Sequence, residues 1–281
     1  MTRSPGTLNI SPGRRLLWAL ALPARAYMRW FPVQRGKGVL LRKVILPILG
    51  KDATFDAALP PRGVVRLRAN ETIGWAWLVY GSFERAELAF AGESAKQGGW
   101  VFDVGGNVGV FSVAVAQQVA SDARVVAFEP LPGNVARLRE NLERCGLGNV
   151  DIAEVAAASA PGETDFLATD DSAYSGLVAS VGEGRKGHVV RVPLATIDSI
   201  WESRGSPRVC FMKLDIEGGE LEALRGATRL LERCRPVLMV EAATPAHVTS
   251  LEQLLAPYGY ARQQPADFEP WNHVFRVAGP S

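Results

Sequence analysis

The chain has 281 residues, of which 47% are hydrophobic and 21% charged, and its net charge is +2. This balance excludes an intrinsically disordered chain. The three cysteines form no CxxC pair, so neither a zinc site nor a disulfide framework is indicated. No run of 18 or more apolar residues exists, and the sequence therefore predicts no conventional transmembrane helix.

Residues 1–51 form a basic arm that holds ten of the 31 Lys and Arg residues and no Asp or Glu. The rest of the chain has 21 basic and 29 acidic residues, a net charge of −8. Basic side chains mixed with Trp, Tyr and Leu are typical of a helix at an anionic membrane surface. A basic helix that packs on the domain or frays is the alternative. Residues 14–26 also resemble a weak signal peptide, although the ligand inferred below argues for a cytoplasmic protein.

Residues 52–99 are predicted to lead into the main domain. The segment VVRLR (64–68) alternates like a short strand, and residues 80–97 have the pattern of a helix. Glu84 and Glu87 would lie in the first turn of that helix, where carboxylates interact favourably with the helix dipole.

From residue 100 to the end, apolar strands alternate with helical segments in a single domain. The predicted strands cover residues 100–106, 124–130, 150–158, 164–169, 188–195, 209–215, 236–242, 260–264 and 273–278. The predicted helices cover residues 108–119, 132–145, 219–232 and 246–256. This alternation predicts an α/β fold with a mostly parallel sheet and helices on both faces.

The first strand of this domain ends in the glycine-rich segment VFDVGGNVG (101–109), at the sheet edge where open α/β folds bind ligands. The glycines do not have the G-x-G-x-x-G spacing of a dinucleotide site. A carboxylate at Asp103 would repel a phosphate but would attract a cation. We therefore expect a cationic, phosphate-free nucleoside, S-adenosylmethionine, rather than NAD. The candidate ligands at this turn are Asp103, Gly105, Gly106, Asn107 and Gly109.

Glu129 ends the second strand and is a further cofactor-binding candidate. A carboxylate at this position can accept hydrogen bonds from both ribose hydroxyls, each contributing about 1.5–3 kcal/mol. Phe128 or Leu131 would pack against the adenine.

Five segments together resemble the FkbM-like methyltransferases, and the similarity covers roughly residues 82–276. They are FDVGGNVGVFS (102–112), AFEPLPGNVARLRENL (127–142), Thr196–Asp198, FMKLDIEGGELEALRGA (211–227) and PVLMVEA (236–242). LDIEGGE is the most specific of these elements. Gly106 departs from the usual alanine, with little expected consequence. The resemblance implies a Rossmann-like class I methyltransferase fold with a seven-stranded sheet, an antiparallel last strand, S-adenosylmethionine as donor and, usually, a hydroxyl acceptor.

Catalytic candidates lie in the segment MKLDIEGGE (212–220). Lys213 and Asp215 share one face of their strand because they are two residues apart. Three interpretations stay open here: Asp215 or Glu217 is a general base, the two together bind a divalent cation, or Glu217 supports the next helix while Asp215 orients a ligand. Lys213 is more often an ion-pair partner than a base.

Two further features bear on this site. Glu241 ends the following strand, and a carboxylate in that apolar run needs a partner if it is buried. The polar segment DDSAYSGL (170–177) is a candidate lid over the acceptor.

The sequence thus predicts an enzyme that methylates a hydroxyl of a small molecule, namely a glycan, a lipid-linked sugar or a secondary metabolite. An N-methyltransferase or nucleic-acid methyltransferase is one alternative, but LDIEGGE stands where an Asn/Asp-Pro-Pro-aromatic strand end is often found in those enzymes. No nucleic-acid partner is therefore expected. A non-catalytic cofactor-binding scaffold is the other alternative. A metal requirement is left open, and no metal ligands are assigned.

Overall fold

The computed structural model describes residues 8–9, 41–50, 53–177 and 187–277. The helix predicted in the basic arm falls on residues that lie mostly outside this description. Within the described part of the chain, no helix is both long and apolar enough to cross a membrane.

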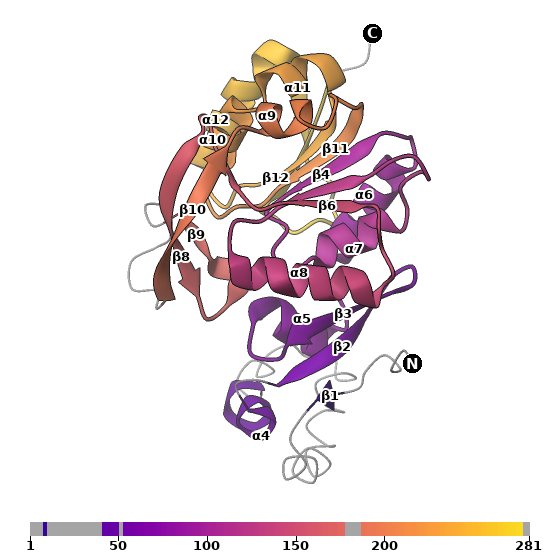
Figure 1. Ribbon diagram of the computed structural model, residues 1–281, viewed down its shortest axis with the longest axis vertical. Coiled ribbons are helices and arrows are strands. Elements are labelled where there is room, and N and C mark those ends of the chain that lie inside the picture. Colours follow the sequence, from indigo (N-terminus) through magenta and orange to yellow (C-terminus); the bar gives the residue numbers. More distant parts are fainter. Residues whose placement is uncertain (1–7, 10–40, 51–52, 178–186, 278–281) are drawn as a thin grey trace.

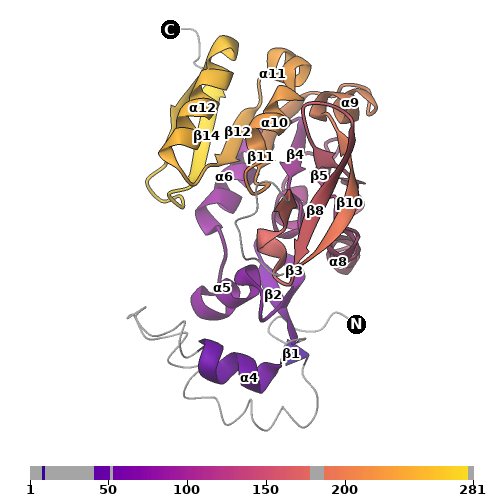
Figure 2. The same ribbon diagram turned by 90° about the vertical axis from the view of Figure 1, so that its left-hand side faces the viewer.

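A seven-stranded sheet forms the centre of the molecule (Figures 1 and 2). Its strand order is β13-β14-β12-β11-β4-β5-β6, and β14 runs antiparallel to both of its neighbours while the other pairs are parallel. The strands are β4 (Trp100–Val104), β5 (Val125–Phe128), β6 (Val150–Ala153), β11 (Val209–Leu214), β12 (Val237–Glu241), β13 (Tyr260–Gln263) and β14 (Asn272–Val277). This arrangement confirms the class I fold that the resemblance implies.

One face of the sheet is covered by the C-terminal helices, drawn in orange and yellow in Figure 1. These are α9 (Ile197–Glu202), α10 (Glu220–Arg225), α11 (Thr228–Cys234) and α12 (Pro245–Leu255), followed by the short η3 (Ala256–Tyr258). Phe102, Met212 and Leu238 pack against them in the largest core cluster.

The opposite face of the sheet is covered by α6 (Arg85–Ala95), α7 (Val110–Ala116) and α8 (Pro132–Arg144). Phe211 and Met239 point to this side and pack with α6 and α7. Since side chains alternate along a strand, Lys213 and Glu241 are directed to this face as well.

Two of the predicted elements are divided in the structure. The helix predicted over residues 219–232 is broken at Gly226 into α10 and α11, and Gly226 lies so close to the chain that a side chain there would overlap the carbonyl oxygen of Ala158. The side chain of Asp198 then starts α11 by accepting hydrogen bonds from the amides of Arg229 (3.0 Å) and Leu230 (2.9 Å).

The strand predicted over residues 150–158 is also divided, into β6 and the short β7 (Ala156–Ala157). β7 leaves the central sheet and joins a separate four-stranded sheet in the order β7-β10-β8-β9. Its other strands are β8 (Gly162–Thr169), β9 (Gly176–Leu177) and β10 (Gly187–Ala195). The two strands predicted near 164–169 and 188–195 therefore form, as an antiparallel pair.

The lead-in is larger than the sequence predicts. It contains β2 (Thr54–Leu59), β3 (Gly63–Arg68) and α5 (Thr72–Tyr80), and a three-stranded sheet forms as β2 pairs with β1 (Leu8–Asn9) on its other side. The π-helical turn η1 (Leu41–Ile45) and α4 (Leu46–Leu49) precede it. Only β3 was predicted, and the helix predicted over 80–97 begins later, at Arg85.

Ion pairs of two buried carboxylates attach this lead-in to α8. Asp56 on β2 contacts Arg66 at 3.2 Å and Arg144 of α8 at 2.6 Å. Glu71, just before α5, makes two hydrogen bonds of 2.7 Å each to Arg137 of α8. The lead-in is thereby held beside the carboxyl ends of the strands, where the site lies.

Candidate functional site

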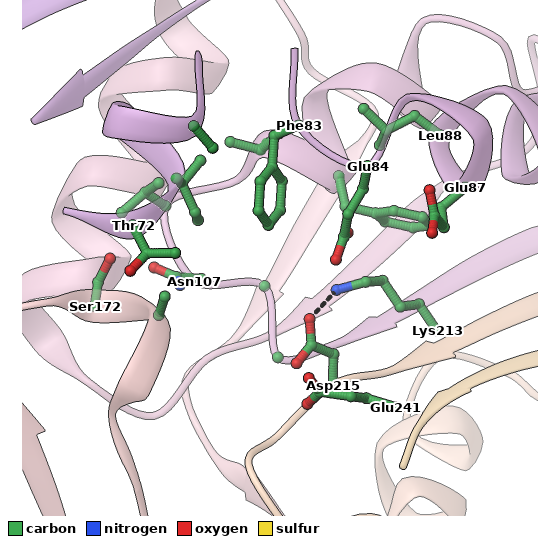
Figure 3. Close-up of a pocket in the computed structure, with 18 of the residues that line it drawn as sticks. Thr72, Phe83, Glu84, Glu87, Leu88, Asn107, Ser172, Lys213, Asp215 and Glu241 are labelled. Atoms are coloured by element: carbon green, nitrogen blue, oxygen red, sulfur yellow. Dashed lines mark hydrogen bonds and ion pairs between the residues drawn. The ribbon is translucent and has the colours of Figure 1, made fainter. Parts of the chain in front are cut away.

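A cavity of about 1040 Å³ opens at the carboxyl ends of β4, β5, β11 and β12 (Figure 3). Strand-end residues line one side of it. Residues from α5, the α5–α6 connection and the start of α6 line another, and the segments 172–175 and 267–271 contribute to the rest. The cavity therefore combines the central sheet with the lead-in.

The glycine turn after β4 passes directly against the end of β11. Gly105 has a positive φ of 99°, and a side chain there would overlap the carbonyl oxygen of Asp215. The amides of Gly105 and Gly106 donate to the carbonyl oxygen of Phe128, at 3.1 and 2.8 Å. The turn thus joins three strand ends and exposes its own backbone to the cavity.

Four of the seven predicted cofactor residues line this cavity, namely Gly105, Gly106, Asn107 and Glu129. Gly109 packs on Leu138 of α8 instead. Phe128 belongs to the core, with its ring 5.6 Å from that of Phe102, and it lines a second cavity.

Asp103 is fully buried and lies outside the cavity wall. Its Oδ2 accepts a hydrogen bond from Ser112 Oγ at 2.6 Å, and its Oδ1 has no partner among the described residues. Burial raises the pKa of Asp103, and the charge of Lys213 opposes this shift. The sequence predicted that Asp103 would attract a cationic ligand. In the structure, the positive charge that acts on it is Lys213, a side chain of the protein.

Glu129 is buried at the junction of the glycine turn and α8. Its carboxylate accepts hydrogen bonds from the amides of Asn107 and Leu131, both at 2.9 Å, and from Asn134 Nδ2 at 3.3 Å. Desolvation outweighs these bonds and raises the pKa of Glu129 to about 7. Oε1 accepts two of these bonds and Oε2 accepts one, so Oε2 still has a lone pair for a ligand hydroxyl.

A second cavity of about 390 Å³ lies on the other side of the glycine turn. Its wall is mostly apolar and includes Phe128 and the chain from Val155 to Ala158. Gly105, Pro130, Phe166 and Ile216 line both cavities. The two spaces are therefore adjacent, with Glu129 facing the larger one and Phe128 facing the smaller one.

Lys213 and Asp215 form a close ion pair on the wall of the larger cavity, with Nζ 2.6 Å from Oδ2 (Figure 3). Lys213 is buried, and its Nζ lies 5.5 Å from the centre of the Phe111 ring. Burial alone would lower the pKa of Lys213, but Asp215 and Glu84 raise it above its usual range. The lysine therefore keeps its charge and acts as an ion-pair partner.

Glu241 faces Asp215 from the neighbouring strand (Figure 3). Burial, together with the charge of Asp215 and a hydrogen bond to it, raises the pKa of Glu241 to about 10. Burial opposes ionisation of Asp215 too, yet Lys213 and Glu241 hold its pKa below the usual value. At neutral pH Glu241 is thus protonated and donates a hydrogen bond to an ionised Asp215. Asp215 is the partner that the sequence analysis expected for a carboxyl group buried in this apolar strand.

The turn after β11 brings Glu217 to the cavity wall with a positive φ of 56°. Glu220 holds this turn, because its Oε1 accepts hydrogen bonds from the amides of Ile216 (2.9 Å) and Gly218 (3.2 Å). Across the described ranges, no group of three His, Cys, Asp or Glu side chains is arranged to bind a metal ion.

Several residues on the cavity wall were not singled out by the sequence, and most come from the lead-in. The sequence pattern predicts Glu84 in the first turn of a helix, where it would interact with the helix dipole. In the structure its side chain points toward Lys213 in the cavity (Figure 3). Thr72 and Ser172 lie at the other end, near Asn107. The Ser172 hydroxyl is buried without a hydrogen-bond partner in the described part of the chain.

The strand order, with a cavity at the strand ends, is that of the class I methyltransferase fold. Residues 103–261 match the methyltransferase FkbM domain, and the chain belongs to this family. The family is one of methyltransferases, so the resemblance drawn from the sequence is confirmed.

Named relatives share part of the chain. Hexuronic acid methyltransferase AglP of Haloferax volcanii is 30% identical over 163 residues, which cover 57% of this chain and 63% of the relative. Methyltransferase 1 of Beauveria bassiana is 27% identical and covers 45% of this chain and 57% of that protein. The chain thus spans less than two thirds of either relative. A crystal structure of methyltransferase FkbM from Methylobacillus flagellatus matches 64% of this chain and 43% of its own, with 19% identity and a TM-score of 0.46.

Proposed function

We propose that this protein transfers a methyl group from S-adenosylmethionine to a hydroxyl oxygen of a sugar-containing acceptor. The observation that supports it most is the pair of adjacent cavities on either side of Gly105. The smaller, apolar one suits an adenine ring between Phe128, Pro130 and Val155. Glu129 lies next to it and suits the ribose hydroxyls, as expected from its strand-end position.

The larger cavity suits the charged end of the same ligand. Its wall has carboxylates at Asp215 and Glu217, which favour an ammonium and a sulfonium. In this arrangement Asp103 acts indirectly, by fixing the glycine turn through Ser112. The bound cofactor would supply an electrophilic methyl group, while the protein aligns the acceptor oxygen with it and excludes water.

Aromatic side chains at the cavity support a sugar as the acceptor. Tyr80 and Trp271 are 54% and 41% exposed, and both line the cavity. Trp75, whose ring centre is 6.0 Å from that of Tyr80, also lines it. Flat aromatic surfaces pack against the apolar faces of sugar rings, and the carboxylates and the Ser172 hydroxyl can bind sugar hydroxyls. The similarity to a relative named as a hexuronic acid methyltransferase also supports a sugar acceptor.

Two measurements test this function. Calorimetry with S-adenosylmethionine tests cofactor binding, and mass spectrometry after incubation with the CD₃-labelled cofactor tests transfer. The acceptor panel would hold neutral methyl glycosides, methyl glucuronoside and glucosamine. Labelled methyl ethers on a glycoside are the expected result. Labelling of glucosamine nitrogen would favour an N-methyltransferase, and binding without any transfer would favour a scaffold.

We also propose, from the sequence of residues 1–51, that the protein is cytoplasmic and that its basic arm contacts an anionic membrane surface. The ten basic residues of the arm and their aromatic and leucine neighbours support this. A lipid-linked sugar would then be reached from the membrane surface.

A further inference from the structure

We propose that Glu84 is the catalytic proton acceptor for the hydroxyl group that is methylated. This assignment rests on the proposed function and adds a residue that lies outside the matched family region, residues 103–261. It also differs from the sequence analysis, which named Asp215 or Glu217 as the general base.

Asp215 is poorly suited to accept a proton, although it lies on the cavity wall. Its Oδ2 is 2.6 Å from Lys213 Nζ, and its carboxylate accepts a hydrogen bond from Glu241. Protonation would break the ion pair and leave Lys213 buried beside a neutral acid. Asp215 is therefore a positioning residue that stays ionised and fixes Lys213.

The backbone conformation of Glu84 and the direction of its side chain suit a catalytic group. It lies directly before α6 with a φ of 44°, in the left-handed region that non-glycine residues seldom adopt. A residue in this place commonly caps its helix, but within the described structure the Glu84 side chain makes no capping bond. Its carboxylate is directed into the cavity toward Lys213 instead (Figure 3).

The other contacts of Glu84 leave its carboxylate able to react. Asn272 Nδ2 donates to its Oε1 at 3.5 Å, which is a long hydrogen bond. The charged groups that face it are Lys213 of β11, Asp215 directly after that strand, and Glu87 from its own helix. Burial, reinforced by the two carboxylates and opposed by Lys213, raises the pKa of Glu84 to about 7. A general base is most effective when its pKa lies near the working pH.

The step balances without another reactant. The acceptor oxygen forms a bond to the methyl carbon, and its proton passes to a carboxylate oxygen of Glu84. The electron pair of the broken carbon–sulfur bond stays on sulfur, giving S-adenosylhomocysteine. Glu84 then returns its proton to solvent through the open cavity.

The decisive comparison is Glu84→Gln against Glu93→Gln, a matched change at an exposed position of the same helix. Both variants and the wild type are assayed with S-adenosylmethionine and the neutral glycoside that the panel selects. We expect Glu84→Gln to lower kcat at least 100-fold, within the range of general-base effects, and to keep the cofactor Kd within twofold. Glu93→Gln should match the wild type. The rise of kcat with pH near neutrality should vanish in Glu84→Gln and persist in Glu84→Asp.

A readout independent of turnover uses the cofactor-free protein. Carboxyl ¹³C NMR of glutamate-labelled protein, with Glu84→Gln to assign the signal, should show Glu84 titrating near neutral pH. A titration near the ordinary value of about 4.3 would overturn the assignment. So would retained kcat in Glu84→Gln, or a weakened cofactor Kd with normal kcat, which would make Glu84 a cofactor ligand. Failure of the proposed function is distinct, since the wild type itself would then methylate no hydroxyl of the panel.

Discussion

Lys213 Nζ lies 2.6 Å from Asp215 Oδ2. The buried Lys213 is also influenced by Glu84 of the lead-in and by Asp103 of β4, so carboxylates from three parts of the chain surround one cation. Because Lys213 is buried, the surrounding carboxylates balance its charge. Several consequences of this charge arrangement are measurable.

Replacing Lys213 with Met should destabilise the protein, because it leaves the carboxylates of Asp215 and Glu84 without their cation. We expect a loss of about 3 kcal/mol in the free energy of unfolding, measured by urea denaturation at pH 7. The stabilisation of Asp215 by its lowered pKa is present above its unfolded pKa and is lost as the pH falls through the lowered folded value. Lys96→Met, at an exposed pair with Glu93, is the control and should cost less than about 1 kcal/mol. An equal effect of the two changes would contradict the role given to Lys213.

Glu241→Gln should be well tolerated at neutral pH, because glutamine resembles the protonated acid that the structure favours. The folded protein holds this proton up to a pKa of about 10, whereas the unfolded chain releases it near pH 4.3. The wild type therefore loses stability relative to the variant as the pH rises across that window. Thermal melting of both proteins at pH 6, 8 and 9 checks this, and a difference in Tm that does not change with pH would refute it.

Cofactor affinity should depend on pH through Glu129. The ionised carboxylate accepts ribose hydroxyls, and its pKa of about 7 means that it becomes protonated in mildly acidic solution. Calorimetry should show S-adenosylmethionine binding more tightly at pH 8 than at pH 6. Glu129→Gln should bind at least about tenfold more weakly, the effect of losing one charge-assisted bond, and should show less pH dependence. Similar affinities at both pH values in the wild type would argue against ribose binding at Glu129.

The two adjacent glycines of the turn should respond very differently to alanine. Gly105→Ala combines a φ of 99° with an overlap on the Asp215 carbonyl, so we expect a loss of more than about 1 kcal/mol of stability and of cofactor binding. At Gly106 an added Cβ would lie 3.1 Å from Ala127 Cβ, a tight contact that a small shift relieves. Gly106→Ala, the residue usual in the family, should keep wild-type affinity. Denaturation and calorimetry on both variants test the contrast.

Membrane contact by the basic arm is best tested by substitution rather than truncation, because Ile45 and Leu49 are buried in the core of the lead-in. Changing Arg14, Arg15, Arg25 and Arg29 together to Gln should release the protein from phosphatidylglycerol vesicles in co-sedimentation. Each basic residue near such a surface contributes about 1 kcal/mol. If the wild type also stays in the supernatant, the arm does not bind membranes.

The sequence predicted the central sheet because its strands are short, apolar and separated by clear helices. It also predicted correctly that Lys213 and Asp215 share a strand face, since that follows from the period of a strand. It did not reveal whether the Asp103 carboxylate faces a ligand or is buried against Ser112, because spacing alone does not orient a side chain at a strand end.

The lead-in was harder to predict for physical reasons. Asp56 interrupts the apolar pattern of β2, and only the fold brings Arg66 and Arg144 to neutralise it. α5 is apolar on most of its surface and so lacks the amphipathic period that marks a helix. Glu84 could not be placed in the site, because Lys213 and Asp215 lie more than a hundred residues further along the chain.

The bond between Glu71 and Arg137 has a consequence for how such enzymes diverge. It fixes residues 53–97, which shape one side of the cavity, to the part of the chain whose strand ends supply the other side. We therefore expect substitutions within residues 53–97 to change which acceptor the cavity holds. Transplanting residues 53–97 between relatives, together with Arg137 and Arg144, which pair with Glu71 and Asp56, is an exchange by which an engineer would try to redirect the enzyme.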